Sequence, residues 1–353
     1  MEYFVERQLL PSNKILRRKL LDEYFSIDLI GFEELEKDHW KLTTFTPDSP
    51  EFYVDPKLEA NLKDWVDPVS VDRISLYKRF YKNCMFSFVD SWTLFYWSLV
   101  SSFLKNETNF SIFHIDDHKD LDTPLIYRED NKDFSLLSGN SLRFSDPPTI
   151  ESIVQEKAVS MGSFMSLFLH ELERVPVYHL KYSHKTNLLV YDIETFYSQD
   201  KLIRIGAKRP SVRLHPGESV NEGGHSYYLS CNFEELANLA NRESVALLHI
   251  DCDAFSNRFN GSSMWQRTIP SIDLNLPQMK KEIEKLFESV ANRFHRIYLN
   301  IALSPGFFPS EYWKEVLDFL LARGEYFGLI QEDDFSRHLK NLYPEEVWSG
   351  FSA

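Results

Sequence analysis

The stretch FSIFHIDDHKD, residues 110–120, joins an apolar run to a polar cluster. The run 110–115 carries large side chains on both faces, which is typical of a strand buried within a parallel sheet. Similar strand-like runs lie at 85–90, 187–193, 245–250 and 296–303. They alternate with helical patterns at 92–104, 149–172 (with a break near 161–162), 278–292 and 310–322. This alternation predicts an α/β fold, a three-layer α/β/α sandwich around a mainly parallel sheet.

Residues 1–80 differ from the rest of the chain in composition and in their pattern of apolar residues. They are rich in charge, with helical spacing at 14–23 and an extended, proline-spaced part at 46–68. We interpret residues 1–80 as an N-terminal extension, a candidate peptide-recognition region, and residues 81–353 as the main domain.

Composition and charge argue against several classes of protein. The 353 residues carry a net charge of −14, which argues against nucleic-acid binding and favours cationic substrates or metal ions. The longest apolar run, 95–103, is too short to span a membrane, and the N-terminus lacks a signal-peptide pattern. Three scattered cysteines fit a reducing compartment. We therefore expect a cytoplasmic protein without nucleic-acid or membrane partners, and the oligomeric state stays open.

Asp116, His118 and Asp120 form an Asp-x-His-x-Asp motif directly after the run 110–115. On an extended chain, residues i, i+2 and i+4 project from one face, so two carboxylates and one imidazole would converge. Oxygen ligands with one imidazole suit a hard or borderline dication such as Mn²⁺. The alternative is a solvated acidic turn, because short motifs also match by chance.

A second motif of the same kind supports the metal-binding interpretation. The run 245–250 leads into Asp251-Cys252-Asp253, and the two carboxylates again share one face. In open parallel sheets, ligands bind at the carboxyl ends of the strands, so both motifs point to one crevice. Five ligands are too many for one catalytic ion with an open position, but they fit two ions that share carboxylates.

These two motifs, in this order, resemble those of the arginase–deacetylase superfamily. The segments HIDDHKDL (114–121), SMGSFM (160–165), LHIDCDAFS (248–256) and IALSPGFF (301–308) resemble its divergent peptide arginases most closely. The tandem His-His of the deacetylase-like enzymes does not occur in the sequence. The resemblance covers roughly residues 84–330. It implies an arginase-like catalytic domain that converts arginine side chains in ribosomally made peptides to ornithine, with release of urea.

The resemblance also implies roles for the five ligands. Asp116 and Asp251 would be the carboxylates that bridge two Mn²⁺ ions. His118 and Asp253 would complete one manganese site, and Asp120 would belong to the other. A hydroxide bridging the ions would attack the guanidinium carbon, and Asp120 would pass a proton to the departing amine.

Arginases place a histidine from an earlier strand end on the ion that Asp120 would bind. The equivalent stretch here, FVDSW at 88–92, has no histidine, and we predict Asp90 as the substitute ligand. The alternative role for Asp90 is the N-cap of the helix predicted at 92–104.

The substrate-binding residues are harder to assign. The segment after the first motif carries substrate contacts in arginases, and here it offers Ser138 and Asn140. His225, in a glycine-rich stretch, is our candidate for the proton-shuttling catalytic histidine. A guanidinium needs a carboxylate opposite its fork of donors, and Glu311 and Asp273 are the candidates. Each of these residues has an ordinary alternative as a capping or surface group.

Four further residues concern the surroundings of the site. Asp192 lies near the end of the run 187–193, and Glu194 follows it. Both are candidates to orient His118 by a hydrogen bond without binding the metal themselves. His249 lies within a strand-like run, which is more typical of a structural histidine than of a catalytic one. The same applies to His295, which precedes another run.

The sequence therefore predicts Mn²⁺-dependent hydrolysis of arginine side chains in a precursor peptide, with two ions per chain. A different two-metal hydrolase, such as an agmatinase-like enzyme, an amidohydrolase or a phosphoesterase, would share these ligands but lack a guanidinium-binding acid. A non-catalytic binding protein with a decayed metal site is the alternative from another class, and the missing first histidine supports it.

Overall fold

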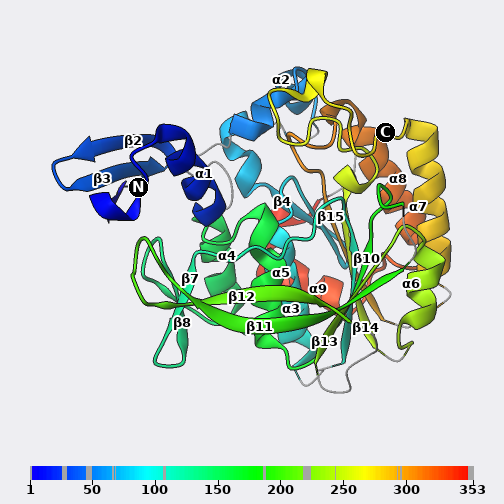
Figure 1. Cartoon of the computed structure of the whole chain (residues 1–353). Helices are drawn as coiled ribbons and strands as arrows, with labels where there is room; N and C mark the ends of the chain where they lie inside the picture. Colours follow the sequence, from blue (N-terminus) through cyan, green and yellow to red (C-terminus); the bar gives the residue numbers. More distant parts are fainter. Residues whose placement is uncertain are drawn as a thin grey trace.

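A sheet of twelve strands organises the chain (Figure 1). The computed structural model describes residues 2–25, 30–44, 50–65, 67, 69–105, 109–185, 188–217, 224–242, 244–291, 293–294 and 296–348. Along the sheet the strands are β4 (Lys78–Tyr81), β5 (Cys84–Ser87), β15 (Ile297–Ala302), β14 (Val245–Asp251), β6 (Phe110–Ile115), β10 (Pro176–Leu180), β13 (His225–Ser230), β11 (Leu189–Gln199), β12 (Lys208–Pro216), β7 (Ile126–Glu129), β8 (Lys132–Ser135) and β9 (Ser141–Leu142). The fold is therefore mixed α/β, as the alternating patterns predict.

The centre of the sheet is parallel. Strands β5, β15, β14, β6, β10 and β13 pair side by side in the same direction. Every residue of β6 and β14 is buried, which explains why these segments are apolar on both faces. The strand-like runs at 110–115 and 245–250 are thus confirmed, and their carboxyl ends lie side by side.

The prediction of a buried parallel strand at 187–193 was wrong. This run belongs to β11, which pairs antiparallel with both β13 and β12 and is largely half-buried or exposed. The β11–β12 hairpin lies between β10 and β13 in the chain. The segment that leads from β10 to β11, residues 181–188, is too short for the helical crossover that parallel strands need. Asn187 and His295 lie outside the described residues.

Helices flank the parallel strands. They are α3 (Trp92–Leu104), α4 (Pro147–Gln155), α5 (Phe164–Glu171), α6 (Phe233–Leu239), α7 (Leu276–Ala291), α8 (Trp313–Tyr326) and α9 (Asp334–Leu342). Figure 1 shows α6 and α7 on one side of these strands and α3 and α5 on the other. The break predicted near 161–162 separates α4 from α5. Residues 92–100 of α3 are all buried, because this helix packs against both the sheet and its neighbours α4 and α5.

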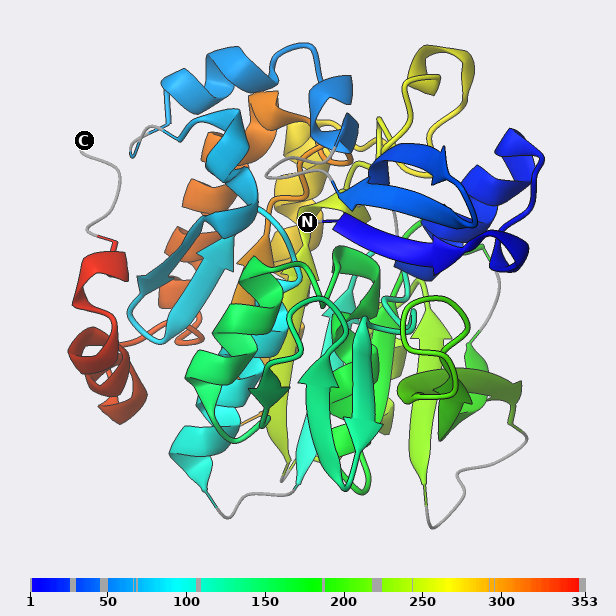
Figure 2. The ribbon, with the colours of Figure 1, turned by 90° about the vertical axis from the view of Figure 1, so that its left-hand side faces the viewer.

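The N-terminal region forms a second, three-stranded antiparallel sheet (Figure 2). Its elements are β1 (Glu2–Glu6), α1 (Lys14–Phe25), β2 (Ile30–Glu36) and β3 (His39–Thr44). The hydroxyl of Tyr24 on α1 hydrogen-bonds to Asp200, and the Arg209 guanidinium lies 4.5 Å from the centre of the Tyr24 ring. Contacts with the β11–β12 hairpin therefore hold α1 against the large sheet.

The extended segment predicted at 46–68 was wrong. It contains a 3-10 turn, Pro50–Val54, and α2 (Leu58–Lys63). Leu58 and Leu62 are four residues apart on one face of this helix, and both are buried. Burial of that face stabilises the helix, although the prolines on either side suggest extended chain.

Candidate metal centre

The two acidic motifs meet where β6 and β14 end. These strands pair in parallel with His249 opposite His114 and Ile250 opposite Ile115. Asp251 therefore ends its strand next to the point where Asp116 leaves the other one. The parallel pairing brings the polar residues after each strand to the same edge of the sheet, as the sequence predicts.

One half of the cluster contains His118, Asp253 and Asp116. The Nδ1 atom of His118 lies 2.8 Å from Oδ2 of Asp253 and 3.5 Å from Oδ1 of Asp116. The backbone N–H of His118 also donates to Oδ1 of Asp116, at 2.6 Å. Ligand atoms of these three residues lie within 4.8 Å of one another, so they could share one ion.

The other half contains Asp90, Asp116 and Asp120, whose ligand atoms also lie within 4.8 Å of one another. All three side chains are buried, and Oδ1 of Asp90, Oδ2 of Asp116 and Oδ2 of Asp120 have no hydrogen-bond partner in the described part of the chain. Asp120 has a φ of 53°, so the loop turns sharply at this residue and brings its side chain back towards the cluster. Buried carboxylate oxygens without a donor are costly, and a dication would satisfy them.

Asp90 does not cap the following helix. The N-cap of α3 is Ser91, and its side chain makes no capping hydrogen bond. The alternative role for Asp90 is therefore wrong. The structure instead brings its carboxylate to the cluster.

Asp251 is buried beside the cluster, and its hydrogen bonds fix its orientation. Its Oδ1 accepts the backbone N–H of Asp253 at 3.0 Å, and its Oδ2 accepts the hydroxyl of Ser304. Each carboxylate oxygen keeps a second lone pair for another partner. Asp251 can thus still bind an ion while Ser304, from the segment after β15, holds it in place.

The charges of this cluster are unfavourable without a cation. Burial and the neighbouring Asp253 raise the pKa of Asp116 to about 7. Burial and nearby carboxylates also raise the pKa values of Asp90, Asp120 and Asp251 well above their ordinary value. A bound dication would reverse these shifts, because it stabilises the ionised carboxylates.

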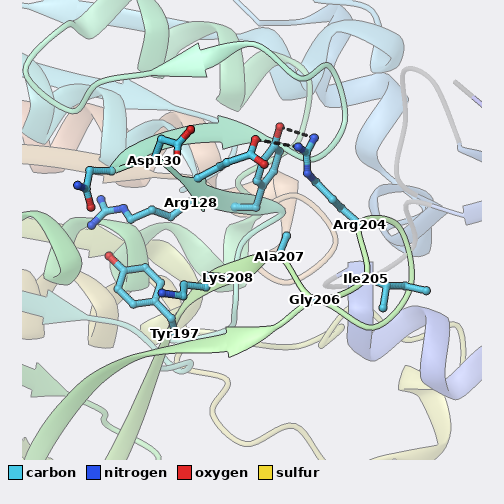
Figure 3. A pocket seen from close by; sticks show the side chains of 11 residues that line it. Arg128, Asp130, Tyr197, Arg204, Ile205, Gly206, Ala207 and Lys208 are labelled. Atoms are coloured by element: carbon cyan, nitrogen blue, oxygen red, sulfur yellow. Dashed lines mark hydrogen bonds and ion pairs between the residues drawn. The ribbon is translucent and has the colours of Figure 1, made fainter.

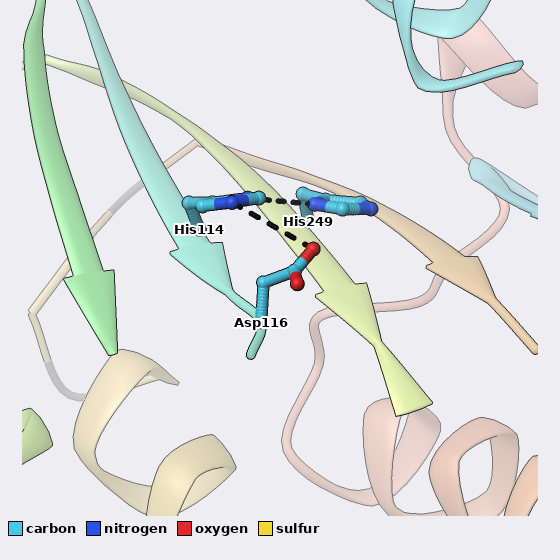
Figure 4. Close-up of side chains that lie close together, drawn as sticks. All are labelled: His114, Asp116 and His249. Carbon is cyan, nitrogen blue, oxygen red and sulfur yellow. Dashed lines mark hydrogen bonds and ion pairs between the residues drawn. The ribbon is translucent and has the colours of Figure 1, made fainter. Parts of the chain in front are cut away.

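Three buried histidines lie across the sheet beneath the cluster. His249, His114 and His179 stand opposite one another on β14, β6 and β10. The Nδ1 atoms of His114 and His249 are 3.0 Å apart, and their rings are nearly parallel, at 14° (Figure 4). Burial lowers the pKa values of all three imidazoles, which keeps them neutral.

These histidines support the loop that carries the acids. Nε2 of His179 lies 3.0 Å from the carbonyl oxygen of Asp116, and Nε2 of His114 lies 3.1 Å from that of His118. Nε2 of His114 also lies 3.4 Å from Oδ2 of Asp120. Sequence reasoning did not single out His114 or His179. His114 and His249 each stand two residues before the first aspartate of a motif, on the same strand face, and this repeat could have indicated His114; no comparable motif follows His179.

A cavity of about 440 Å³ opens above the cluster. Its walls combine acids of the two motifs with cationic and apolar side chains. They are Asp90, Asp117, His118, Lys119, Asp120, Leu121, Asp122, Met161, Gly162, Lys181, Asp251, Asp253, Ser304 and Phe307. A second pocket, of about 710 Å³, lies between the β7–β8 hairpin and the β11–β12 connection (Figure 3). Its walls contain none of the predicted site residues.

Glu311 and Asp273 do not line the cavity above the cluster, and each already binds a guanidinium of the protein itself. The Nη1 atom of Arg258 lies 2.9 Å from Glu311, and its Nε lies 3.2 Å from Asp273. Glu311 also pairs with Lys57. Our assignment of these acids to the substrate was wrong, because long-range ion pairs that the sequence does not reveal occupy both.

The structure does not bring His225, Ser138 and Asn140 to the cluster. His225 is the first residue of β13, which runs parallel to β6, so it lies at the opposite edge of the sheet from Asp116. Its Nδ1 accepts the backbone N–H of Val175 at 3.0 Å. Ser138 and Asn140 are exposed between β8 and β9, where the backbone N–H of Asn140 donates to Ser138. The roles predicted for these three residues are therefore wrong.

Asp192 and Glu194 do not orient His118. Both lie on the β11–β12 hairpin, where Glu194 is exposed and pairs with His215 at 2.8 Å and with Arg213 at 3.6 Å. Asp253 contacts His118 instead. The predicted role depended on a parallel strand at this position, which the antiparallel pairing of β11 rules out.

Comparison of the chain with protein-family models finds no match, and comparison with curated proteins finds none either. Within the described residues, no helix has both the length and the apolar character needed to cross a membrane. The functional argument therefore depends on the cluster, its cavity and the motifs that form them.

Proposed function

We propose that this protein is a Mn²⁺-dependent hydrolase that converts arginine side chains of a precursor peptide to ornithine, with release of urea. The observation that carries the proposal is the convergence of buried oxygens of Asp90, Asp116 and Asp120 that find no hydrogen-bond partner among the described residues. They lie next to a second group, which contains His118 and Asp253. A donor set of several carboxylates and one imidazole fits hard or borderline dications such as Mn²⁺.

We assign each residue a role in this reaction. Asp116, which belongs to both groups, and Asp251 would bridge two ions. His118 and Asp253 would complete one site, and Asp90 and Asp120 the other. When bound, the ions would supply a water of lowered pKa as the nucleophile. Asp120, ionised while it binds the ion, would accept a proton from the attacking water and pass it to the nitrogen that leaves the guanidinium carbon.

The proposal extends to the fold and the partner. We propose a three-layer α/β/α sandwich for residues 81–353, with residues 1–80 as an extension that binds the precursor peptide. In the small β1–β3–β2 sheet, β1 and β2 pair with β3 alone among the described strands, and an extended peptide could add as a further strand at such an edge. A cytoplasmic location would supply both ribosomally made peptides and Mn²⁺.

The decisive experiment incubates the full chain with Mn²⁺ and arginine-containing peptides. Urea is measured directly, and mass spectrometry detects ornithine in place of arginine. The proposal expects both products from the wild type and neither from Asp116→Asn, a variant of nearly identical size. A wild type that binds Mn²⁺ but releases no urea would favour another two-metal hydrolase, and one that binds no dication would favour a decayed site.

A further inference from the structure

Asp122 differs from the other acids around the cavity. Asp90, Asp116, Asp120, Asp251 and Asp253 form the buried cluster at its base. Asp117 also lines the cavity, but internal partners surround its carboxylate. These partners are Ser183, Asn257, Ser271 and Lys181.

The Asp122 carboxylate has no hydrogen bond or ion pair with any described residue, and its side chain is exposed where the others are buried. Two cations also line the cavity, but neither pairs with Asp122. Lys181 binds the carbonyl and carboxylate oxygens of Asp117. Lys119 lies 5.9 Å from the centre of the Tyr191 ring on β11. Asp122 is therefore a free anion at the mouth of a cavity whose base holds the cluster.

The backbone fixes the position of Asp122. Its N–H donates to the carbonyl oxygen of Gly162 at 2.8 Å. A Cβ atom on Gly162 would lie only 2.9 Å from Oδ2 of Asp122, so the absence of a side chain at 162 leaves room for this carboxylate. Partial desolvation of the carboxylate by the surrounding protein raises the pKa of Asp122, while the nearby His118 lowers it.

Apolar side chains also line this cavity. Leu121, Met161 and Phe307 line the same cavity. The ring of Phe307 packs edge-on against His118 of the cluster, with 5.3 Å between the ring centres. A cavity that combines apolar walls with an exposed acid and a buried acidic cluster suits a substrate with an aliphatic stem and positive charge.

We propose that the negative charge of Asp122 at the entrance of the cavity disfavours arginine substrates that carry a free carboxylate there. The proposal rests on the proposed function, because it assigns Asp122 to the same substrate. An arginine within a peptide has no α-carboxylate, whereas free arginine does. Asp122 thereby selects an amide-linked arginine over the free amino acid.

The test measures binding, so it does not depend on turnover. Titration calorimetry of the Mn²⁺-loaded full chain compares arginine amide with free arginine, which differ only at the carboxyl group. The wild type should bind the amide more tightly, by roughly fivefold at low salt, and this preference should weaken as salt rises. Asp122→Asn should remove most of the preference, and Asp122→Lys should reverse it.

Two further variants make the test specific. Gly162→Ala should weaken the preference, because the added methyl group displaces the Asp122 carboxylate. Glu311→Gln, which changes an acid away from the cavity, should leave the preference as in the wild type. All variants should bind the same number of Mn²⁺ ions as the wild type.

An equal preference in Asp122→Asn and wild type would overturn the proposal, as would a wild type that binds neither ligand. Failure of the proposed function looks different: the wild type would show the Asp122-dependent preference in calorimetry but release no urea.

Discussion

The Nδ1 atom of His118 lies 2.8 Å from Oδ2 of Asp253, so residues from two distant motifs form one ion pair. Burial alone would lower the pKa of His118, but Asp253 and Asp116 raise it well above its ordinary value. Without a metal ion, the proton of His118 therefore partly neutralises the cluster. A dication would displace that proton and bind the imidazole and the carboxylate directly.

Loss of one carboxylate should abolish stabilisation by metal. With Mn²⁺ at 100 times its dissociation constant, the wild type should gain about 2.7 kcal/mol in the free energy of unfolding. Asp116→Asn should lose most of this gain, because Asp116 belongs to both groups of ligands. Thermal unfolding with and without Mn²⁺ measures the effect. An Asp130→Asn variant at an exposed turn is the control and should keep the full gain; a full gain in Asp116→Asn would contradict the assignment.

The metal-free protein should depend on pH through Asp116. Its pKa of about 7 in the folded state exceeds its ordinary value of 3.8, so the folded state binds the proton more tightly. The stability that this group contributes is complete below pH 3.8 and is lost as the pH rises through 7. Asn imitates the neutral acid. As the pH rises over this range, the free energy of unfolding of Asp116→Asn should therefore increase relative to that of the wild type, by up to about 4 kcal/mol. Urea unfolding in the presence of a metal chelator measures the difference in the free energy of unfolding between the two proteins. A difference that stays constant with pH would contradict this prediction.

The Arg258 network should matter for stability and not for catalysis. Arg258→Ala removes the ion pairs to Glu311 and Asp273 and should lower the free energy of unfolding by about 1–3 kcal/mol. Urea release by the folded protein should stay near the wild-type rate. A loss of turnover in the still-folded Arg258→Ala variant, with metal content unchanged, would contradict this prediction. It would indicate that Glu311 or Asp273 takes part in substrate binding after all.

His179 should act through the backbone of the acidic loop. His179→Phe removes the contact with the Asp116 carbonyl and leaves the Tyr227 hydroxyl without its imidazole partner. We expect a loss of about 1–3 kcal/mol in stability and weaker Mn²⁺ binding. Tyr227→Phe removes the second of these contacts alone, so it should cost less stability and leave Mn²⁺ binding nearly unchanged. Equal Mn²⁺ affinity in His179→Phe and the wild type would contradict this role.

Local periodicity made part of the site predictable. Asp116, His118 and Asp120 follow one strand and Asp253 follows its neighbour, so the period of two and the parallel pairing bring them together. Asp90 was predicted from the resemblance to arginases, as the substitute for their first metal-binding histidine. The parallel centre of the sheet was also predictable, because strands buried on both faces are continuously apolar.

The remaining assignments depended on contacts between distant parts of the chain. No local pattern shows that Arg258 binds Glu311 and Asp273, or that β11 turns antiparallel and carries Asp192 and Glu194 away from His118. Asp122 was overlooked as an acid for the substrate for a similar reason. Its lack of a partner becomes visible only when every neighbour is in place.

The pairing of His114 with His249 makes the centre intolerant of slippage. Strand side chains alternate between faces, so a single-residue insertion within β6 would turn either His114 or Asp116 to the other side of the sheet. Such a shift would separate several ligands of the cluster at once, whereas a substitution removes a single ligand. Short insertions should therefore be tolerated at the outer hairpins, such as the turn at Ser138, and not between residues 110 and 120.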